Sequence, residues 1–170
     1  MALPAIVGGR EDPPEVGRNR YTARMSTPIV SERAERLRHF FSFAPMKATF
    51  GMELTYDAEG NAQFEMPYLM DLCHAMKDTH GGAIATLIDN AGWFTAATRY
   101  DNWVSTSEMT VRLHEPANRE DLFATACVVR AGKRMCSTTM EVRSASGRLV
   151  ATGAGTFVVS SIPLTVDGLE

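Results

Sequence analysis

Apolar positions follow a helical period near the start of the chain. Within residues 27–44 they recur at roughly every third or fourth position, which is typical of an amphipathic helix. The positions that carry this pattern are Ile29, Ala34, Leu37 and Phe40 or Phe41. The helix should end before Pro45, because proline cannot continue it. A short turn is expected at residues 46–50.

Alternating apolar and polar positions predict strands along much of the remaining chain. Two short strands, at residues 52–56 and 62–66, flank the turn-forming pair Gly60-Asn61 and should form a hairpin. Residues 67–79 show no period and are predicted to be irregular. Four longer strands are predicted in the last part of the chain, at residues 104–114, 122–130, 135–144 and 149–160.

A long helix is predicted between the hairpin and the four strands, where the sequence is HGGAIATLIDNAGWFTAATRY. It begins at two glycines and runs for about four to five turns. On a helical wheel one side should face the sheet, and it carries Ile84, Leu87, Ile88, Ala91 and Phe94.

The opposite side of this helix lacks the charged residues that normally face solvent. It carries Asp89 and Trp93, four residues apart and therefore adjacent, with Ala85 and Ala96 beside them. The helix is therefore expected to be buried on nearly all sides. Because a single sheet covers only one side, a second subunit is expected to cover the rest.

The element order predicts an α+β domain, in which an antiparallel sheet packs on one buried helix. We divide the chain into an N-terminal extension (1–26), an N-terminal helix (27–44), a main domain (45–163) and a C-terminal tail (164–170). The extension has no hydrophobic period and should be flexible. The alternative is an arm that packs on a partner subunit.

Asp89 is the first candidate for a functional residue. An ionised carboxylate in an apolar setting is costly unless it is paired or used. The structural alternative is that Asp89 bonds to a backbone group or to an arginine.

Composition excludes several classes of function. The formal charge of −3 over 170 residues provides no general basic field for nucleic acid. No stretch approaches the roughly 20 apolar residues of a membrane span, and the N-terminus lacks a basic leader, so a cytoplasmic protein is expected. The three cysteines suggest reduced thiols. Cys73, His74 and His80 fit no zinc spacing, so no metal is expected.

Three segments resemble the hotdog-fold thioesterases of the phenylacetyl-CoA thioesterase type. They are HGGAIATLIDNAG, the strand TSEMTVRLHEPA and the basic turn RAGKRM, and the resemblance extends over about residues 45–160. It implies a curved antiparallel sheet around one helix and a homodimer, commonly paired into a tetramer, with active sites between subunits. It also implies hydrolysis of acyl-coenzyme A thioesters without a cofactor, since coenzyme A is part of the substrate.

The resemblance also assigns catalytic roles. Asp89 matches the acidic position, where it activates water as a general base or attacks directly. The amide of Gly81, at the helix start, matches an oxyanion donor, although the glycine could serve only the sharp turn. Thr106 matches a Ser/Thr position that holds the water or the carboxylate from the partner subunit. His74 is a departure, because many relatives have asparagine there, and an imidazole can change charge near neutral pH.

Binding roles are assigned to residues around these positions. The substrate-binding candidates are His80, Gly82, Asn90 and Trp93. The CoA-binding candidates are Arg130, Lys133 and Arg134, whose alternative is a solvated hairpin tip. Trp93, Phe94 and the methionines of the irregular segment 67–79 could line an apolar pocket, whereas His39 and His114 are expected to be ordinary histidines.

Two other functions are compatible with the same fold. One is a non-catalytic acyl-CoA sensor, and the other is a hotdog enoyl-CoA hydratase or dehydratase that uses His80 with Asp89. The acyl group is not specified by the sequence, and carrier-protein thioesters are an alternative to CoA thioesters.

Overall fold

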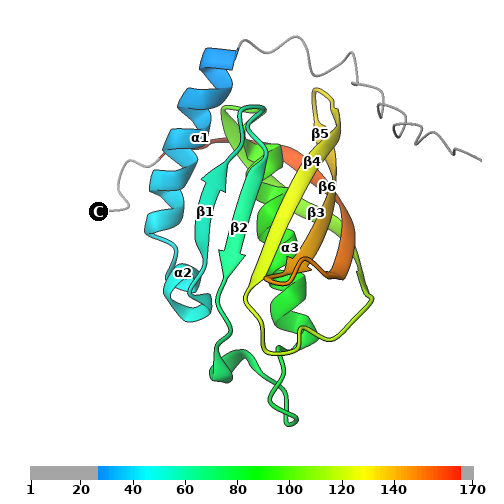
Figure 1. Ribbon diagram of the computed structural model, residues 1–170. Helices are drawn as coiled ribbons and strands as arrows, with labels where there is room; N and C mark the ends of the chain where they lie inside the picture. The colour runs from blue at the N-terminus through cyan, green and yellow to red at the C-terminus, as the bar shows by residue number, and fades with distance from the viewer. Residues whose placement is uncertain (1–26, 166–170) are drawn as a thin grey trace, which may run out of the picture.

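A six-stranded antiparallel sheet curves around one long helix in the computed structural model, which describes residues 27–165 (Figure 1). The strands lie in the order β1-β2-β4-β5-β6-β3. Helix α3 (Gly81–Ala97) packs on the sheet. The strands are β1 (Glu53–Tyr56), β2 (Ala62–Met66), β3 (Asn102–Leu113), β4 (Leu122–Ala131), β5 (Met135–Ser144) and β6 (Leu149–Pro163). The predicted α+β hotdog architecture is confirmed.

The predicted elements are all present, with two local differences. The turn expected at residues 46–50 is a short helix, α2 (Pro45–Phe50). Pro45 suits the first turn of a helix, and Gly51 ends α2 in the left-handed conformation, with φ of 65°. The irregular segment before α3 contains one 3-10 turn, Met70–Leu72.

Helix α3 lies very close to the sheet because a glycine of α3 faces β6 and a glycine of β6 faces α3. A Cβ atom on Gly92 of α3 would lie 2.8 Å from Cζ of Phe157. One on Gly153 of β6 would lie 2.6 Å from Cγ2 of Ile88. The predicted sheet-facing side of α3 is accordingly buried, with Leu87 and Ile88 fully inaccessible to solvent. This contact fixes the opposite side of α3, which carries Asp89.

Helix α1 (Thr27–Ser42) lies along the β1 edge of the sheet (Figure 1). Leu37 and Phe41 are buried against the core. Just after the C-terminus of α3, Asp101 forms an ion pair of 2.7 Å with Arg33 of α1. Helix α1 therefore supplies part of the cover for α3 that the helical wheel leads us to expect from a second subunit alone.

The two chain ends lie mostly outside the described residues, so the predicted N-terminal extension (1–26) and residues 166–170 are not described. Leu164, the first residue of the predicted C-terminal tail, is buried, and its N–H donates to the Asp101 carbonyl at 2.9 Å. Leu164 thus packs with the hydrophobic core of the main domain. Between residues 27 and 165 no helix combines the length and apolarity needed to cross a membrane.

Candidate active site

Asp89 lies in the third turn of α3, half-buried and away from the sheet. Its Oδ1 accepts a hydrogen bond of 2.9 Å from the Thr106 hydroxyl on β3. Among the described residues no arginine or lysine forms an ion pair with it. The structural alternative, a carboxylate bound to an arginine or a backbone group, is therefore not what the structure contains.

Burial raises the pKa of the Asp89 carboxyl above its usual value. The hydrogen bond from Thr106 favours the ionised form and offsets only part of that increase. The site thus holds a carboxylate with an enhanced affinity for protons, which is the property that a general base requires.

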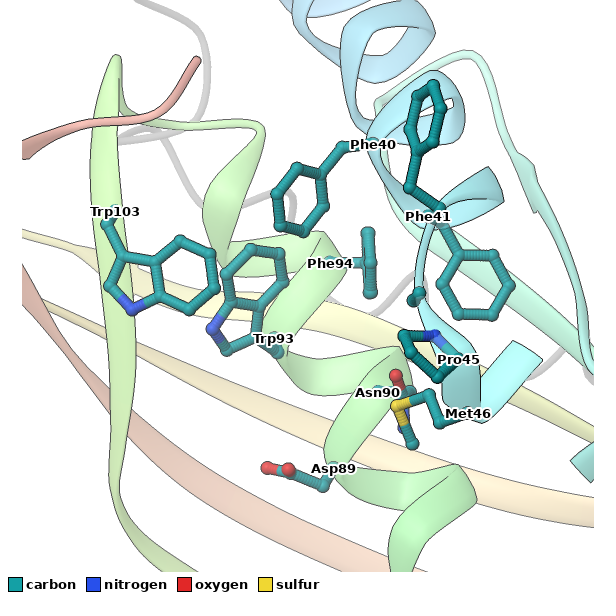
Figure 2. Close-up of a pocket in the computed structure, with 11 residues that line it drawn as sticks. Phe40, Phe41, Pro45, Met46, Asp89, Asn90, Trp93, Phe94 and Trp103 are labelled. Atoms are coloured by element: carbon teal, nitrogen blue, oxygen red, sulfur yellow. The ribbon is translucent and has the colours of Figure 1, made fainter. Parts of the chain in front are cut away.

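An apolar cavity of ≈ 420 Å³ opens beside Asp89. Aromatic side chains from α1, α3 and β3 form its walls, and Asp89 is the one charged residue that lines it (Figure 2). The lining residues are Phe40, Phe41, Phe43, Ala44, Pro45, Met46, Asp89, Asn90, Trp93, Phe94 and Trp103. Trp93 and Phe94, the two aromatic residues of α3 predicted to line a pocket, are both in this lining, whereas Met70 and Met76 of the irregular segment are not.

Trp93 and Asn90 have fixed positions in this wall. The indole N–H of Trp93 donates to the Val104 carbonyl at 2.7 Å. The Asn90 side-chain amide donates to the Thr86 carbonyl at 2.8 Å, so its oxygen remains available at the cavity. Two of the four predicted substrate-binding residues, Asn90 and Trp93, thus line the same space as Asp89, and His80 and Gly82 do not.

The N-terminus of α3 presents one uncommitted amide. His80 is the N-cap, and its Nδ1 accepts the N–H of Gly82 at 2.9 Å. The N–H of Gly81 makes no hydrogen bond to any residue from 27 to 165. It lies at the positive end of the helix dipole, where an anionic oxygen is stabilised. Gly81, not Gly82, is therefore the available donor, and His80 has a structural role.

A second cavity, of ≈ 310 Å³, surrounds this helix start. It is lined by Gly81, His74 and His114 among others. His74 accepts the N–H of Met76 on its Nδ1 at 3.1 Å. The neutral ring then carries its proton on Nε2, as a second donor beside Gly81. His114, which the sequence did not distinguish, also lines this cavity.

The two halves of the predicted site are separated along α3. Eight residues at a rise of about 1.5 Å each place the Gly81 amide and the Asp89 carboxylate about 12 Å apart along the helix axis. The two cavities share no lining residue. Within one protomer, Asp89 therefore lies with Thr106, and Gly81 lies with His74. The first pair does not meet the second pair in the same protomer.

Arg130, at the end of β4, and Lys133 and Arg134, in the following turn, are the residues of the predicted basic turn, and all three are exposed. None of them forms an ion pair with a described carboxylate. Tyr100, just after α3, donates its hydroxyl to the Gly132 carbonyl at 2.8 Å. The turn is thereby held at the end of α3 opposite to Gly81.

Several cavity residues could not be found from the sequence motif. Phe40, Met46 and Trp103 come from segments on either side of it, and only the folded chain brings them to Trp93. The apolar period of α1 indicated a buried helix face, not a cavity wall. In the described part of the chain no three His, Cys, Asp or Glu side chains gather into a group that could hold a metal ion.

The fold and this site define a hotdog-fold protein with an acidic residue on its central helix. Residues 76–151, which include Gly81, Asp89 and Thr106, match the family model described as Thioesterase superfamily. This segment of the chain is therefore similar to the thioesterase superfamily, and that similarity supports thioester hydrolysis in general.

Solved structures with the same fold include three whose proteins are described by family or operon. A thioesterase family protein from Silicibacter pomeroyi is 26% identical, with a TM-score of 0.70 over 75% of this chain and 99% of that chain. The E. coli PaaI protein from the phenylacetic acid degradation operon is 20% identical, with a TM-score of 0.73 over 80% and 99%. A phenylacetic acid degradation-related protein from Ralstonia eutropha is 20% identical, with a TM-score of 0.66 over 75% and 99%. No curated protein matches the sequence.

Proposed function

We propose that the protein hydrolyses acyl-CoA thioesters to a free acid and coenzyme A, with Asp89 as the catalytic carboxylate. The observation that carries this proposal is the setting of Asp89. Its carboxylate forms no ion pair with a cation among residues 27–165. Its pKa is raised by burial, and an apolar cavity lies beside it. A carboxylate held only for stability would normally be paired.

The chemistry follows from these groups. Asp89 takes a proton from a water molecule while the water oxygen attacks the thioester carbonyl. The tetrahedral oxyanion is stabilised by the Gly81 amide and by Nε2–H of His74. When the C–S bond breaks, the electron pair leaves on sulfur, and the proton on Asp89 neutralises the thiolate. Direct attack by Asp89 through an acyl-enzyme anhydride is the alternative route.

A complete site requires two protomers, because Asp89 and Gly81 of one chain are about 12 Å apart along α3. Strand β3 forms one edge of the sheet and is 12 residues long. A long edge strand offers unpaired backbone groups to another chain. We propose that two copies associate so that Asp89 and Thr106 of one face Gly81 and His74 of the other. A further pairing of dimers is compatible with this arrangement.

The test is the release of free thiol from a panel of short, medium, long and aryl acyl-CoAs, followed with a thiol-trapping dye. Hydrolysis should be about 10²–10⁴-fold slower in Asp89→Asn. Tight binding without thiol release would identify a sensor and overturn the proposal. Hydration of an enoyl-CoA without thiol release would instead identify a hydratase, with the same consequence.

We expect the Thr106→Val variant to shift the acid limb of the kcat/KM profile toward higher pH. The Thr106 hydroxyl favours the ionised form of Asp89, so its removal raises the Asp89 pKa further. The acid limb reports the pKa of the base in the free enzyme. Thr110→Val, an exposed change on the same strand, should leave the profile unchanged. An unshifted limb in Thr106→Val would show that Asp89 is not the titrating base.

We propose further that the basic turn binds the phosphates of coenzyme A. Replacement of Arg130, Lys133 and Arg134 by alanine should raise KM for acyl-CoA by roughly tenfold or more, since bonds to charged groups are among the stronger ones. An acyl-pantetheine substrate lacks the nucleotide phosphates and serves as the control. Equal losses on both substrates would contradict this role and indicate a structural effect.

A further inference from the structure

The cavity beside Asp89 is larger and more aromatic than the attack of water on a thioester requires. Its volume of ≈ 420 Å³ lies within the range of about 300–1,000 Å³ found for small-ligand pockets. Apart from Asp89 its lining carries no charged group, and Asn90 supplies its one side-chain amide. The cavity is therefore suited to an uncharged apolar group attached to the thioester carbonyl, which is attacked by the water that Asp89 activates.

One side of the cavity is rigid. Trp93 is fixed by its hydrogen bond to the Val104 carbonyl and lies 5.0 Å from Trp103, measured between ring centroids. Phe94 lies behind Trp93 and packs on Phe41, with ring centroids 5.3 Å apart, as part of the buried core. These rings cannot move without disturbing the core.

Phe40 of α1 is held differently. Its ring stacks on Trp93 with centroids 6.2 Å apart and an interplanar angle of 19°, and it meets the edge of Trp103 at 5.7 Å. It is only half-buried. Figure 2 shows the Phe40 ring on the side of Trp93 that is away from Asp89, and Phe40 lines the same cavity. A chain that extends from Asp89 past Trp93 therefore meets the Phe40 ring.

We propose that this cavity binds the acyl group and that Phe40 is the residue that limits the length of that group. The inference rests on the proposed function and names its substrate class: thioesters of uncharged, apolar acids. An acyl group that ends in a second carboxylate is excluded, because it would meet Asp89 and an apolar wall without a cation. The acyl group is the expected occupant because the cavity opens on Asp89, the carboxylate proposed to activate the water that attacks the acyl carbonyl.

The experiment measures kcat/KM for saturated straight-chain acyl-CoAs from acetyl to palmitoyl in the wild type, Phe40→Ala and Phe40→Leu. In the wild type each added methylene should raise kcat/KM about fourfold until the chain reaches Phe40, after which kcat/KM should fall. Phe40→Ala should move this optimum to longer chains, and Phe40→Leu should move it by less. Phe123→Ala removes an exposed phenylalanine from the outer face of β4 and should leave the optimum where it is.

The outcomes separate the two proposals. If the wild type releases no thiol from any acyl-CoA, the proposed function fails. If it hydrolyses the series but the optimum is the same in all variants, the role of Phe40 is overturned, as would follow if residues 1–26 or a second copy filled the cavity. If Phe40→Ala is inactive because α1 packing is lost, the Phe40→Leu variant provides the test: a shift of its optimal acyl-chain length supports the role of Phe40, and an unchanged optimum overturns it. Efficient hydrolysis of succinyl-CoA would overturn the assigned substrate class.

Discussion

Replacement of Asp89 by asparagine should lower kcat/KM for acyl-CoA hydrolysis by about 10²–10⁴-fold, which is the range for removal of a general base. Asparagine keeps the size of the side chain and can still accept the hydrogen bond from Thr106. It cannot take a proton from water. The measurement is steady-state thiol release at saturating and limiting substrate. Asp71→Asn, an exposed aspartate outside both cavities, is the matched control. Full activity in Asp89→Asn would remove Asp89 from the mechanism.

The same variant should be more stable than the wild type at neutral pH. The folded-state pKa of Asp89 is raised, so the folded protein binds this proton more tightly than the unfolded chain does. The stability from this group is therefore greatest below the unfolded pKa of about 3.9 and is lost as the pH rises through the folded pKa. Asparagine does not ionise and avoids the loss. Thermal unfolding should show a higher Tm for the variant at neutral pH and a smaller difference in acid; a lower Tm at neutral pH would contradict the raised pKa.

Replacement of Gly81 by proline should lower kcat by about 10²–10³-fold, the usual effect of losing one oxyanion donor. Proline is tolerated at the first position of a helix, and the extended backbone of His80 suits the residue before it. The change therefore removes the N–H with little effect on α3. Gly81→Ala is the control: it places the same Cβ 2.7 Å from Cδ1 of Leu113, an exposed flexible group, but keeps the N–H. Equal losses in both variants would indicate crowding rather than a missing donor.

Mixing the two inactive chains tests whether the site is shared between protomers. A heterodimer of Gly81→Pro and Asp89→Asn contains one site with both defects and one site with none. Random association of the two chains should therefore restore about a quarter of the wild-type activity in a symmetric dimer. No recovery, with exchange of subunits shown independently, would mean that each site lies within one chain.

Sequence periodicity is sufficient to predict the elements that make up the sheet and α3. Buried and exposed positions alternate along all of β5 and along the first six residues of β4, so the bounds of both strands are predicted within one residue. The lack of charge opposite the sheet side of α3 is enough to single out Asp89 from the amino-acid sequence. Helix α2 is missed because six residues around one proline show no period.

The cavity could not be predicted from the sequence because it depends on contacts between distant elements. Phe40, Trp93 and Trp103 lie on three separate elements, and nothing local indicates that their rings meet. The separation of Asp89 from Gly81 follows from helix geometry alone. Thr106 is assigned only through the family resemblance, since a threonine on a strand has no distinguishing pattern.

Helix α1 lies outside the segment matched by the family model, which begins at residue 76. Gly81, Asp89 and Thr106 lie within the matched segment, and His74 lies just before it. Half of the aromatic wall instead comes from α1 and the residues after it, which are attached by Leu37, Phe41 and the Arg33–Asp101 ion pair. Selectivity and reactivity are therefore separable in this architecture. With the proposed roles of Asp89 and Phe40, grafting a different first helix onto the unchanged catalytic segment would change the acyl preference and leave the catalytic groups in place.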